Sequence, residues 1–292
     1  MLAPETALAL SAPLRRHSPT LDVDERAAAL RVRYFQGGHP APNAVSWQAA
    51  EAVLRGLKQQ GSGALVIFLV SGGGSALLEK PISGEISLAD LVTTYDKLVL
   101  SGASIVEINA IRKHLSAVKG GRLARAAAPA QQVSILISDV PEHRPDALAS
   151  GPTMPDSSTV EDCYRVAEQH QLGPQLPDAV RRVFTERRLE ETPKAGDEAF
   201  ARSRWWTVLS NALVRQAAAA AAARAGSAVT MDNRCDDWDY AAAGDYLLER
   251  LRELRSRPMR RWRSSIGAGT AFWLIATRAQ AVSIRLTALS GS

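Results

Sequence analysis

Apolar residues form two kinds of run along the chain, and the two kinds alternate. Short runs rich in β-branched residues lie at 65–70, 133–140, 205–210 and 228–231. Between them, apolar residues recur with helical spacing at 46–58, 87–100, 105–114, 159–170, 212–225 and 238–255. Apolar strands that alternate with helices indicate a parallel sheet. We therefore predict an α/β fold with a mostly parallel, Rossmann-like sheet covered by helices on both faces.

Polar residues and glycines mark the ends of several predicted helices. Ser87 with Asp90, and Thr159 with Asp162, have the spacing of capping boxes. Gly102 follows one apolar-periodic segment and the glycine pair 120–121 interrupts another. These signals predict where the helices begin and end.

The chain is expected to divide into three segments. Residues 1–36 mix Pro, Ala and Arg without a period and are predicted to be irregular, whereas 37–255 form the α/β domain. Residues 256–292 contain arginines but no acidic residue, and they are predicted to be a truncated or aberrant basic tail. Because this tail accounts for the net charge of +5, we expect no nucleic-acid partner.

The composition is that of a globular protein, with 46% hydrophobic and 22% charged residues. No uninterrupted apolar run is long enough for a membrane span, and the first residues lack the basic region of a secretory signal. The two cysteines, Cys163 and Cys235, do not make a disulfide framework, and neither has neighbours that would activate a thiolate. We therefore expect a cytoplasmic protein without a membrane partner.

The strand predicted at 65–70 runs directly into three glycines. We call residues 71–75 the glycine loop; its members are Ser71, Gly72, Gly73, Gly74 and Ser75. Bare backbone N–H groups can approach an oxyanion that side chains would hold off, and the two serines add hydroxyl donors. The loop is predicted to bind an anion, although packing of a tight turn explains the glycines equally well.

A second segment, 107–124, concentrates cations. Its polar and basic residues are Asn109, Arg112, Lys113, Lys119 and Arg122. A solvated basic helix face is the usual explanation of such a run. Glycines at 120 and 121 are costly in a surface helix, so close backbone approach or function is the favoured explanation.

A third segment, 137–153, follows the strand predicted at 133–140. Ser138 and Asp139 lie where that strand ends, which is a usual place for a catalytic or metal-binding carboxylate. A cap for the following loop explains Asp139 equally well. Asp146 and Asp156 flank the Ser-Gly-Pro-Thr turn and are expected to be turn residues.

Both histidines near these segments have ordinary explanations. His39 precedes a proline and is expected to make a hydrogen bond within its loop, while His114 lies in a predicted helix and is expected to be structural.

Several long motifs, in order, resemble those of the class II glycerate 2-kinase family, whose members end in a MOFRL domain. The matching stretches are GGHPAPNAVSWQAAEAVL (37–54), LVSGGGSALLEKPI (69–82), LSGASIVEINAIRKHLSAVKGGRLA (100–124), LISDVPEHRPDALASGPTMPDSSTVEDC (136–163) and SNALVRQAAAAAAARAG (210–226). The resemblance implies ATP-dependent phosphorylation of D-glycerate to 2-phosphoglycerate with Mg²⁺. Some relatives carry the label hydroxypyruvate reductase, but the chain has no Gly-x-Gly-x-x-Gly fingerprint for a dinucleotide.

The resemblance also implies roles for the three segments. The glycine loop would cradle a phosphate or the glycerate carboxylate, with Asn109 and Ser138 as further binding residues. Arg112, Lys113 and Lys119 would neutralise charge, with Arg112 and Lys119 catalytic. Asp139 would orient Mg²⁺ or the attacking hydroxyl group.

Three departures from the family pattern favour a second hypothesis. The chain has no lysine before Gly37, where relatives carry a catalytic Gly-Lys turn, and no Gly-Gly-Arg-Asn-Gln motif near its end. Glu142, His143 and Arg144 stand where an acidic Gly-Asp-Asp is usual. The alternative is a catalytically inactive anion-binding remnant or gene fragment, whose exposed apolar surface would favour homo-oligomers.

Overall fold

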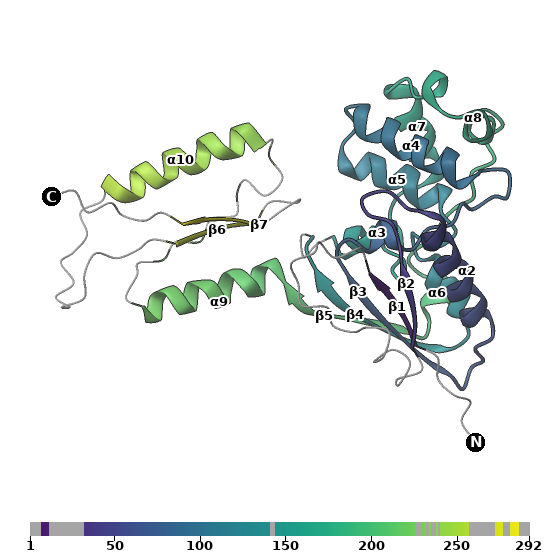
Figure 1. Ribbon diagram of the computed structural model, residues 1–292, viewed down its shortest axis with the longest axis horizontal. Coiled ribbons are helices and arrows are strands. Elements are labelled where there is room, and N and C mark those ends of the chain that lie inside the picture. The colour runs from purple at the N-terminus through teal and green to yellow at the C-terminus, as the bar shows by residue number, and fades with distance from the viewer. Residues whose placement is uncertain are drawn as a thin grey trace. The chain divides into compact units, whose positions relative to one another are not determined.

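The computed structural model describes residues 7–11, 32–140, 144–225, 229, 231, 234, 238, 240–256, 272–276 and 281–285. The chain divides into two compact units, residues 1–208 and 209–292. Figure 1 shows their helices and strands, and each unit is described by itself.

The main sheet consists of β3 (Leu65–Ser71), β4 (Gln131–Ser138) and β5 (Ser203–Ser210), in the spatial order β3-β4-β5. β3 and β4 are parallel and in register from the Leu65–Gln131 pair to the Ser71–Ile137 pair. The predicted parallel α/β arrangement is therefore confirmed. Because parallel strands end at the same edge, the loops after β3 and β4 lie next to one another.

The two faces of β3 differ in what covers them. Val66 and Phe68 pack against a buried cluster from α2 (Ala44–Lys58) and α6 (Arg122–Ala127). On the other face Leu65, Ile67 and Leu69 are 58%, 56% and 78% exposed. The helical cover expected on both faces is thus present on one face of β3, and the apolar side chains of its other face contact solvent.

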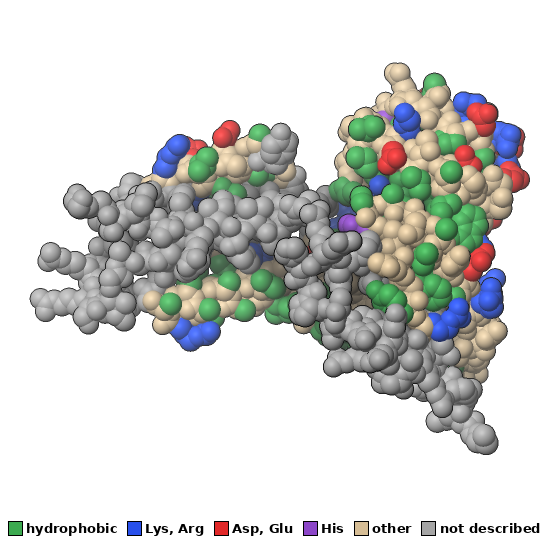
Figure 2. All heavy atoms as spheres, in the orientation of Figure 1, with side chains coloured by type: hydrophobic (Ala, Val, Ile, Leu, Met, Phe, Trp, Pro, Cys, Tyr) green, Lys and Arg blue, Asp and Glu red, His purple; other side chains and the backbone are tan. Residues whose placement is uncertain are grey.

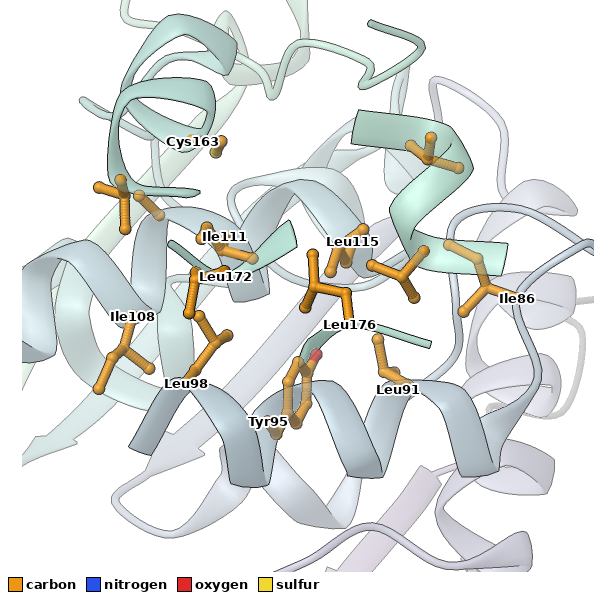
Figure 3. Close-up of a cluster of buried hydrophobic side chains, with 14 residues drawn as sticks. Ile86, Leu91, Tyr95, Leu98, Ile108, Ile111, Leu115, Cys163, Leu172 and Leu176 are labelled. Atoms are coloured by element: carbon orange, nitrogen blue, oxygen red, sulfur yellow. The ribbon is translucent and has the colours of Figure 1, made fainter. Parts of the chain in front are cut away.

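Four helices form a second layer with its own core. They are α4 (Leu88–Leu100), α5 (Ile105–Leu115), α7 (Val160–Gln169) and α8 (Asp178–Thr185). Figure 3 shows side chains such as Leu98, Ile111 and Leu172 pointing toward one another between these helices. Burying each such side chain contributes about 1.5–3 kcal/mol, so this cluster is a main source of stability for the helices around the site.

The predicted helix ends are confirmed where local polar residues marked them. Asp90 N donates to Ser87 Oγ at 3.0 Å and Asp162 N to Thr159 Oγ1 at 3.1 Å, which completes both capping boxes. Gly102 has a φ of +77° just after α4. Sequence signals that act within one turn of the backbone therefore predicted the local structure well.

The first 36 residues contain more regular structure than expected. β1 (Ala7–Ser11) and β2 (Val32–Gln36) pair in parallel. The predicted irregular segment thus contains two strands, each too short for its apolar pattern to reveal it. The described part of the first unit also contains the short helix α3 (Gly74–Leu77) and the 3₁₀ turns η1 (Pro145–Ser150), η2 (Gly173–Gln175) and η3 (Glu198–Phe200).

The second unit contains α9 (Asn211–Arg224), α10 (Tyr240–Ser256) and an antiparallel pair, β6 (Phe272–Ala276) with β7 (Ala281–Arg285). Both predicted helices are confirmed. Of the strand predicted at 228–231, Val229 and Met231 lie outside any strand, while residues 228 and 230 fall outside the described residues. The domain limits at 36 and 255 stay predictions.

The surface of the first unit mixes charges of both signs. Figure 2 shows acidic and basic side chains interspersed along the α7–α8 side, without a field of one sign on that face. Among the described residues, no helix combines the length and the apolar character that a membrane crossing needs.

Candidate functional site

The glycine loop turns sharply at the carboxyl end of β3. Gly73 has a φ of +81°, a left-handed conformation that favours glycine, and α3 begins at the next residue. A Cβ atom added to Gly72 would lie 2.0 Å from Asp139 Oδ2. A side chain at position 72 would therefore displace the Asp139 carboxylate.

The end of β4 brings polar groups to the same edge. Ser138 Oγ donates to the Val140 carbonyl at 3.2 Å, and Asp139 follows as an exposed residue. Ser71 is in register with Ile137, so the glycine loop begins beside these two residues. The structure thus brings together the predicted loop and the predicted carboxylate.

Lys119 is buried directly behind the glycine loop. Its Nζ lies 2.6 Å from Glu79 Oε2 and donates to the carbonyl oxygens of Ser75 and Leu78. Burial lowers the pKa of Lys119, and the Glu79 carboxylate opposes that shift. The ammonium group is turned toward the protein, where it fixes both ends of α3.

Glu79 was not predicted, although it lies within the quoted glycine motif. Its carboxylate is completely buried and accepts hydrogen bonds from Tyr95, at 2.8 Å, and from Ser116. It also accepts the backbone N–H of Lys80 at 2.9 Å. The two leucines before Glu79 are the only local sign that this carboxylate is buried. The sign is weak because its hydrogen-bond donors, Tyr95 on α4 and Ser116 after α5, lie far from Glu79 in the sequence.

Arg112 lies against the ring of Tyr95, with its Cζ 4.8 Å from the ring centroid. Its Nε is buried, and nothing among the described residues accepts a hydrogen bond from it. Burial lowers the pKa of this guanidinium group, and the negative charges of Glu79 and Asp96 oppose that shift. Arg112 therefore has donor capacity that the described protein does not use.

Lys113 joins two carboxylates that had been expected to be turn residues. Its Nζ donates to Asp146 Oδ2 at 3.0 Å and to Asp156 Oδ1 at 2.9 Å. Asp156 also accepts from Thr192 Oγ1 at 2.9 Å and from Ser158. Burial alone would raise the pKa of Asp156, but the charge of Lys113 and the hydrogen bonds from Lys113 and Ser158 outweigh it and lower that pKa.

The loop after β4 contains three consecutive residues with left-handed backbone. Ala149, Ser150 and Gly151 have φ values of +48°, +61° and +61°. Such a conformation in two non-glycine residues persists only where surrounding contacts enforce it, and it is typical of functional loops. One of these contacts joins Ser150 Oγ to Ser75 Oγ of the glycine loop at 2.9 Å.

The glycine pair at 120 and 121 binds that loop through its backbone. Gly120 N donates to Ser150 O at 3.0 Å and Gly121 N to Gly151 O at 2.7 Å. Both glycines have positive φ, and a Cβ on Gly121 would lie 2.8 Å from Met154 O. The expected close backbone approach is confirmed.

The alternative of a solvated basic helix face is excluded by burial. Lys113, Lys119 and Arg122 are only 3%, 1% and 7% exposed, and α5 ends before the last two of them. These cations belong to the interior of the first unit.

Comparisons with known proteins show which family this fold belongs to. A family model described as "Domain of unknown function (DUF4147)" matches residues 7–185. The chain belongs to the DUF4147 family. Among its relatives, a putative hydroxypyruvate reductase of Agrobacterium vitis is 42% identical over 196 residues, or 67% of this chain and 43% of that protein.

Glycerate kinases are also relatives of this DUF4147 protein. The D-glycerate 2-kinase of Thermotoga maritima is 44% identical over 160 residues, or 55% of this chain and 37% of the relative. A crystal structure of a glycerate kinase from the same organism matches with a TM-score of 0.64 and 30% identity, covering 88% of this chain and 57% of that one. The chain spans less than half the length of these two curated relatives. The resemblance to the glycerate 2-kinase family is confirmed.

Other predicted residues of the DUF4147 chain have simpler surroundings. His39 Nε2 would lie 3.8 Å from a Cβ on Gly73, so this imidazole lies beside the glycine loop. Asn109 is half-buried on α5. His114 is buried between Ala110 O, at 2.8 Å, and Glu191 Oε1, at 2.9 Å, which confirms its structural role. Burial raises the pKa of the Cys163 thiol, as expected for a cysteine that is not activated.

The described residues of this DUF4147 chain offer few protein ligands for a metal ion. Within the part of the chain that the structure describes, no three His, Cys, Asp or Glu side chains are grouped so that they could hold a metal ion. Glu142 and His143, and the acidic residues 236, 237 and 239, lie outside that part. Asp139 as a metal ligand stays a prediction.

Proposed function

We propose that this chain binds the anionic groups in an ATP-dependent glycerate 2-kinase, which converts D-glycerate to 2-phosphoglycerate. The observation that carries the proposal is the glycine loop at the carboxyl edge of a parallel sheet, with the Asp139 carboxylate against Gly72. Ligands of α/β proteins bind at that edge. The names of the Thermotoga relative and its solved neighbour support glycerate as the acceptor.

In this proposal the glycine loop holds a phosphate group or the glycerate carboxylate. The N–H groups of residues 72–74 can approach an oxyanion closely, and the hydroxyl groups of Ser71 and Ser75 add donors. Arg112 contributes positive charge and the donor capacity of its buried Nε. Lys119 acts behind the loop, because its ammonium group already binds Glu79 and two carbonyl oxygens.

Asp139 fits a magnesium ion that ATP brings with it. Mg²⁺ in kinases is usually held by one or two carboxylates together with phosphate oxygens, and it retains water ligands. A single exposed carboxylate at the sheet edge, with Ser138 beside it, is consistent with that pattern. The ion would supply neutralisation of phosphate charge in the reaction.

Transfer joins the 2-hydroxyl oxygen of glycerate to the γ-phosphorus, while the bond from that phosphorus to the bridging oxygen of the departing ADP breaks and the hydroxyl proton is released to water. Such reactions depend mainly on positioning and on charge stabilisation by the protein. The residues of the glycine loop would therefore act by holding the reacting groups in line. The cysteine content supports a cytoplasmic location for this activity.

The test is turnover of the purified chain with ATP, Mg²⁺ and D-glycerate, coupled through enolase so that only 2-phosphoglycerate gives a signal. We expect Asp139→Asn to lower kcat, whereas Asp178→Asn, on the exposed start of α8, serves as the matched control. Absence of turnover in a folded chain that binds ATP would instead favour the anion-binding remnant. Absence of both turnover and anion binding would refute the proposal.

A further inference from the structure

We propose that Glu79 is a positioning residue for the glycine loop, acting through the ammonium group of Lys119. Neither residue is required to touch the substrate in this proposal. The claim that Glu79 holds the glycine loop in place is argued from contacts within the first unit alone. Only the effect of Glu79 on catalysis rests on the proposed function.

The Glu79 carboxylate is fully used by the protein around it. Oε2 faces Lys119 Nζ at 2.6 Å and Tyr95 Oη at 2.8 Å, while Oε1 accepts from Ser116 Oγ and from Lys80 N. A carboxylate has about four lone-pair sites, and four donors fill them here. Glu79 therefore connects groups, and it has no acceptor site left for a substrate proton.

The Lys119 ammonium group is used in the same way. It has three donors, and it faces three oxygens, those of the Glu79 carboxylate and of the Ser75 and Leu78 carbonyls. Those two carbonyls lie at either end of α3, a single turn that is too short to be stable alone. The conformation of the loop in front of α3 thus depends on where this ammonium group is held.

The same turn of chain also fixes the loop after β4. Gly120, next to Lys119, donates its N–H to Ser150 O at 3.0 Å, and Ser150 Oγ meets Ser75 Oγ at 2.9 Å. Ser75 is therefore held through its carbonyl by Lys119 and through its hydroxyl by Ser150. Displacing Lys119 would loosen the glycine loop at the point where the two strand ends meet.

Removal of one partner differs physically from removal of both. Glu79→Gln leaves a buried ammonium group without its countercharge, which destabilises the fold strongly. The double variant Glu79→Gln/Lys119→Met buries no net charge, so the fold is expected to recover. Methionine cannot donate to Ser75 O or Leu78 O, so the loop remains without its anchor.

The experiment is hydrogen exchange of the full chain, followed by mass spectrometry, for wild type, Lys119→Met and the double variant. We expect peptides that cover 71–78 to exchange roughly tenfold faster or more in both variants, because the local hydrogen bonds are lost. Peptides of α7 (Val160–Gln169) are expected to keep their protection in the double variant. Glu85→Gln, which removes an exposed pair with Arg188, is the matched control and should change neither region.

Two readouts separate positioning from mere stability. In the double variant we expect the thermal midpoint of unfolding to recover. The Kd for inorganic phosphate is expected to stay raised and kcat to stay lowered, with KM measured separately. Wild-type exchange at 71–78 in the double variant would overturn the proposal, as would full recovery of phosphate affinity along with the midpoint. If the wild type shows neither turnover nor anion binding, the proposed function fails, while the exchange result still decides this inference.

Discussion

Gly121 is the residue whose replacement should be most informative about how the site is built. It is the N-cap residue of α6 and has a φ of +81°, and a Cβ there would lie 2.8 Å from both Met154 O and Phe200 Cζ. Gly102 has nearly the same φ, +77°, but a Cβ there would meet nothing within 4 Å. The pair Gly121→Ala and Gly102→Ala therefore separates backbone strain from close approach.

The expected magnitudes follow from these two contributions. An alanine held in left-handed backbone costs roughly 1–2 kcal/mol, and this cost applies to both variants. Overpacking of a filled site adds about 1–3 kcal/mol, and this addition applies to Gly121→Ala alone. We thus expect Gly121→Ala to lower the free energy of unfolding by about 1–3 kcal/mol more than Gly102→Ala does.

The assay is urea-induced unfolding followed by far-UV circular dichroism, with m-values compared so that midpoints can be converted to free energies. Replacing glycine by alanine also lowers the conformational entropy of the unfolded chain. This effect is the same in both variants, so it cancels when their free energies of unfolding are compared. Equal destabilisation by the two substitutions would refute the conclusion that Gly121 is required for the approach of Met154 to α6.

Three further outcomes are expected. Burial alone would raise the pKa of Glu191, but hydrogen bonds from Lys194 and His114 lower it from 4.5 to about 2. The ionised Glu191 carboxylate therefore stabilises the fold fully above pH 4.5, and this stabilisation is lost as the pH falls toward about 2. Acid titration of the unfolding midpoint should accordingly be less steep in Glu191→Gln. In a Cys235→Ser chain, Cys163 should react with a thiol reagent only on unfolding, and fast labelling of the native chain would contradict its burial. Thr159→Ala should cost about 1 kcal/mol in urea unfolding, because it removes a capping box, and no change would contradict that role.

The sequence predicted well what neighbouring residues decide. The capping boxes at Ser87 and Thr159 and the turn at Gly102 depend on groups within a few residues, and each was found as expected. α8 was not predicted, although its apolar residues Val180, Val183 and Phe184 recur with helical spacing. β1 and β2 pair across twenty residues of intervening chain, so their pairing was not predicted. Their formation depends on distant partners that local patterns do not contain.

The candidate site shows the same limit more sharply. Its cations were recognised, but the partners of Lys113 and Lys119 were not, because Asp146, Asp156 and Glu79 come from other elements. A basic residue in a sequence predicts positive charge without indicating whether a protein carboxylate or a ligand will neutralise it. Only the fold, by bringing those elements together, decides between the two.

In the proposed kinase site, the two lysines and Arg112 therefore differ in what neutralises their charge. Lys113 and Lys119 each bind carboxylates of the protein, so their charges are already balanced in the interior. The Arg112 guanidinium lies instead over Tyr95, and among the described residues its buried Nε makes no hydrogen bond. Burying a donor without a partner is costly, and in the proposed site a bound anion would provide that partner. Under the proposed function, neutralisation of a substrate phosphate would therefore fall to Arg112 and the backbone of the glycine loop, and the two lysines would hold the neighbouring loops in place.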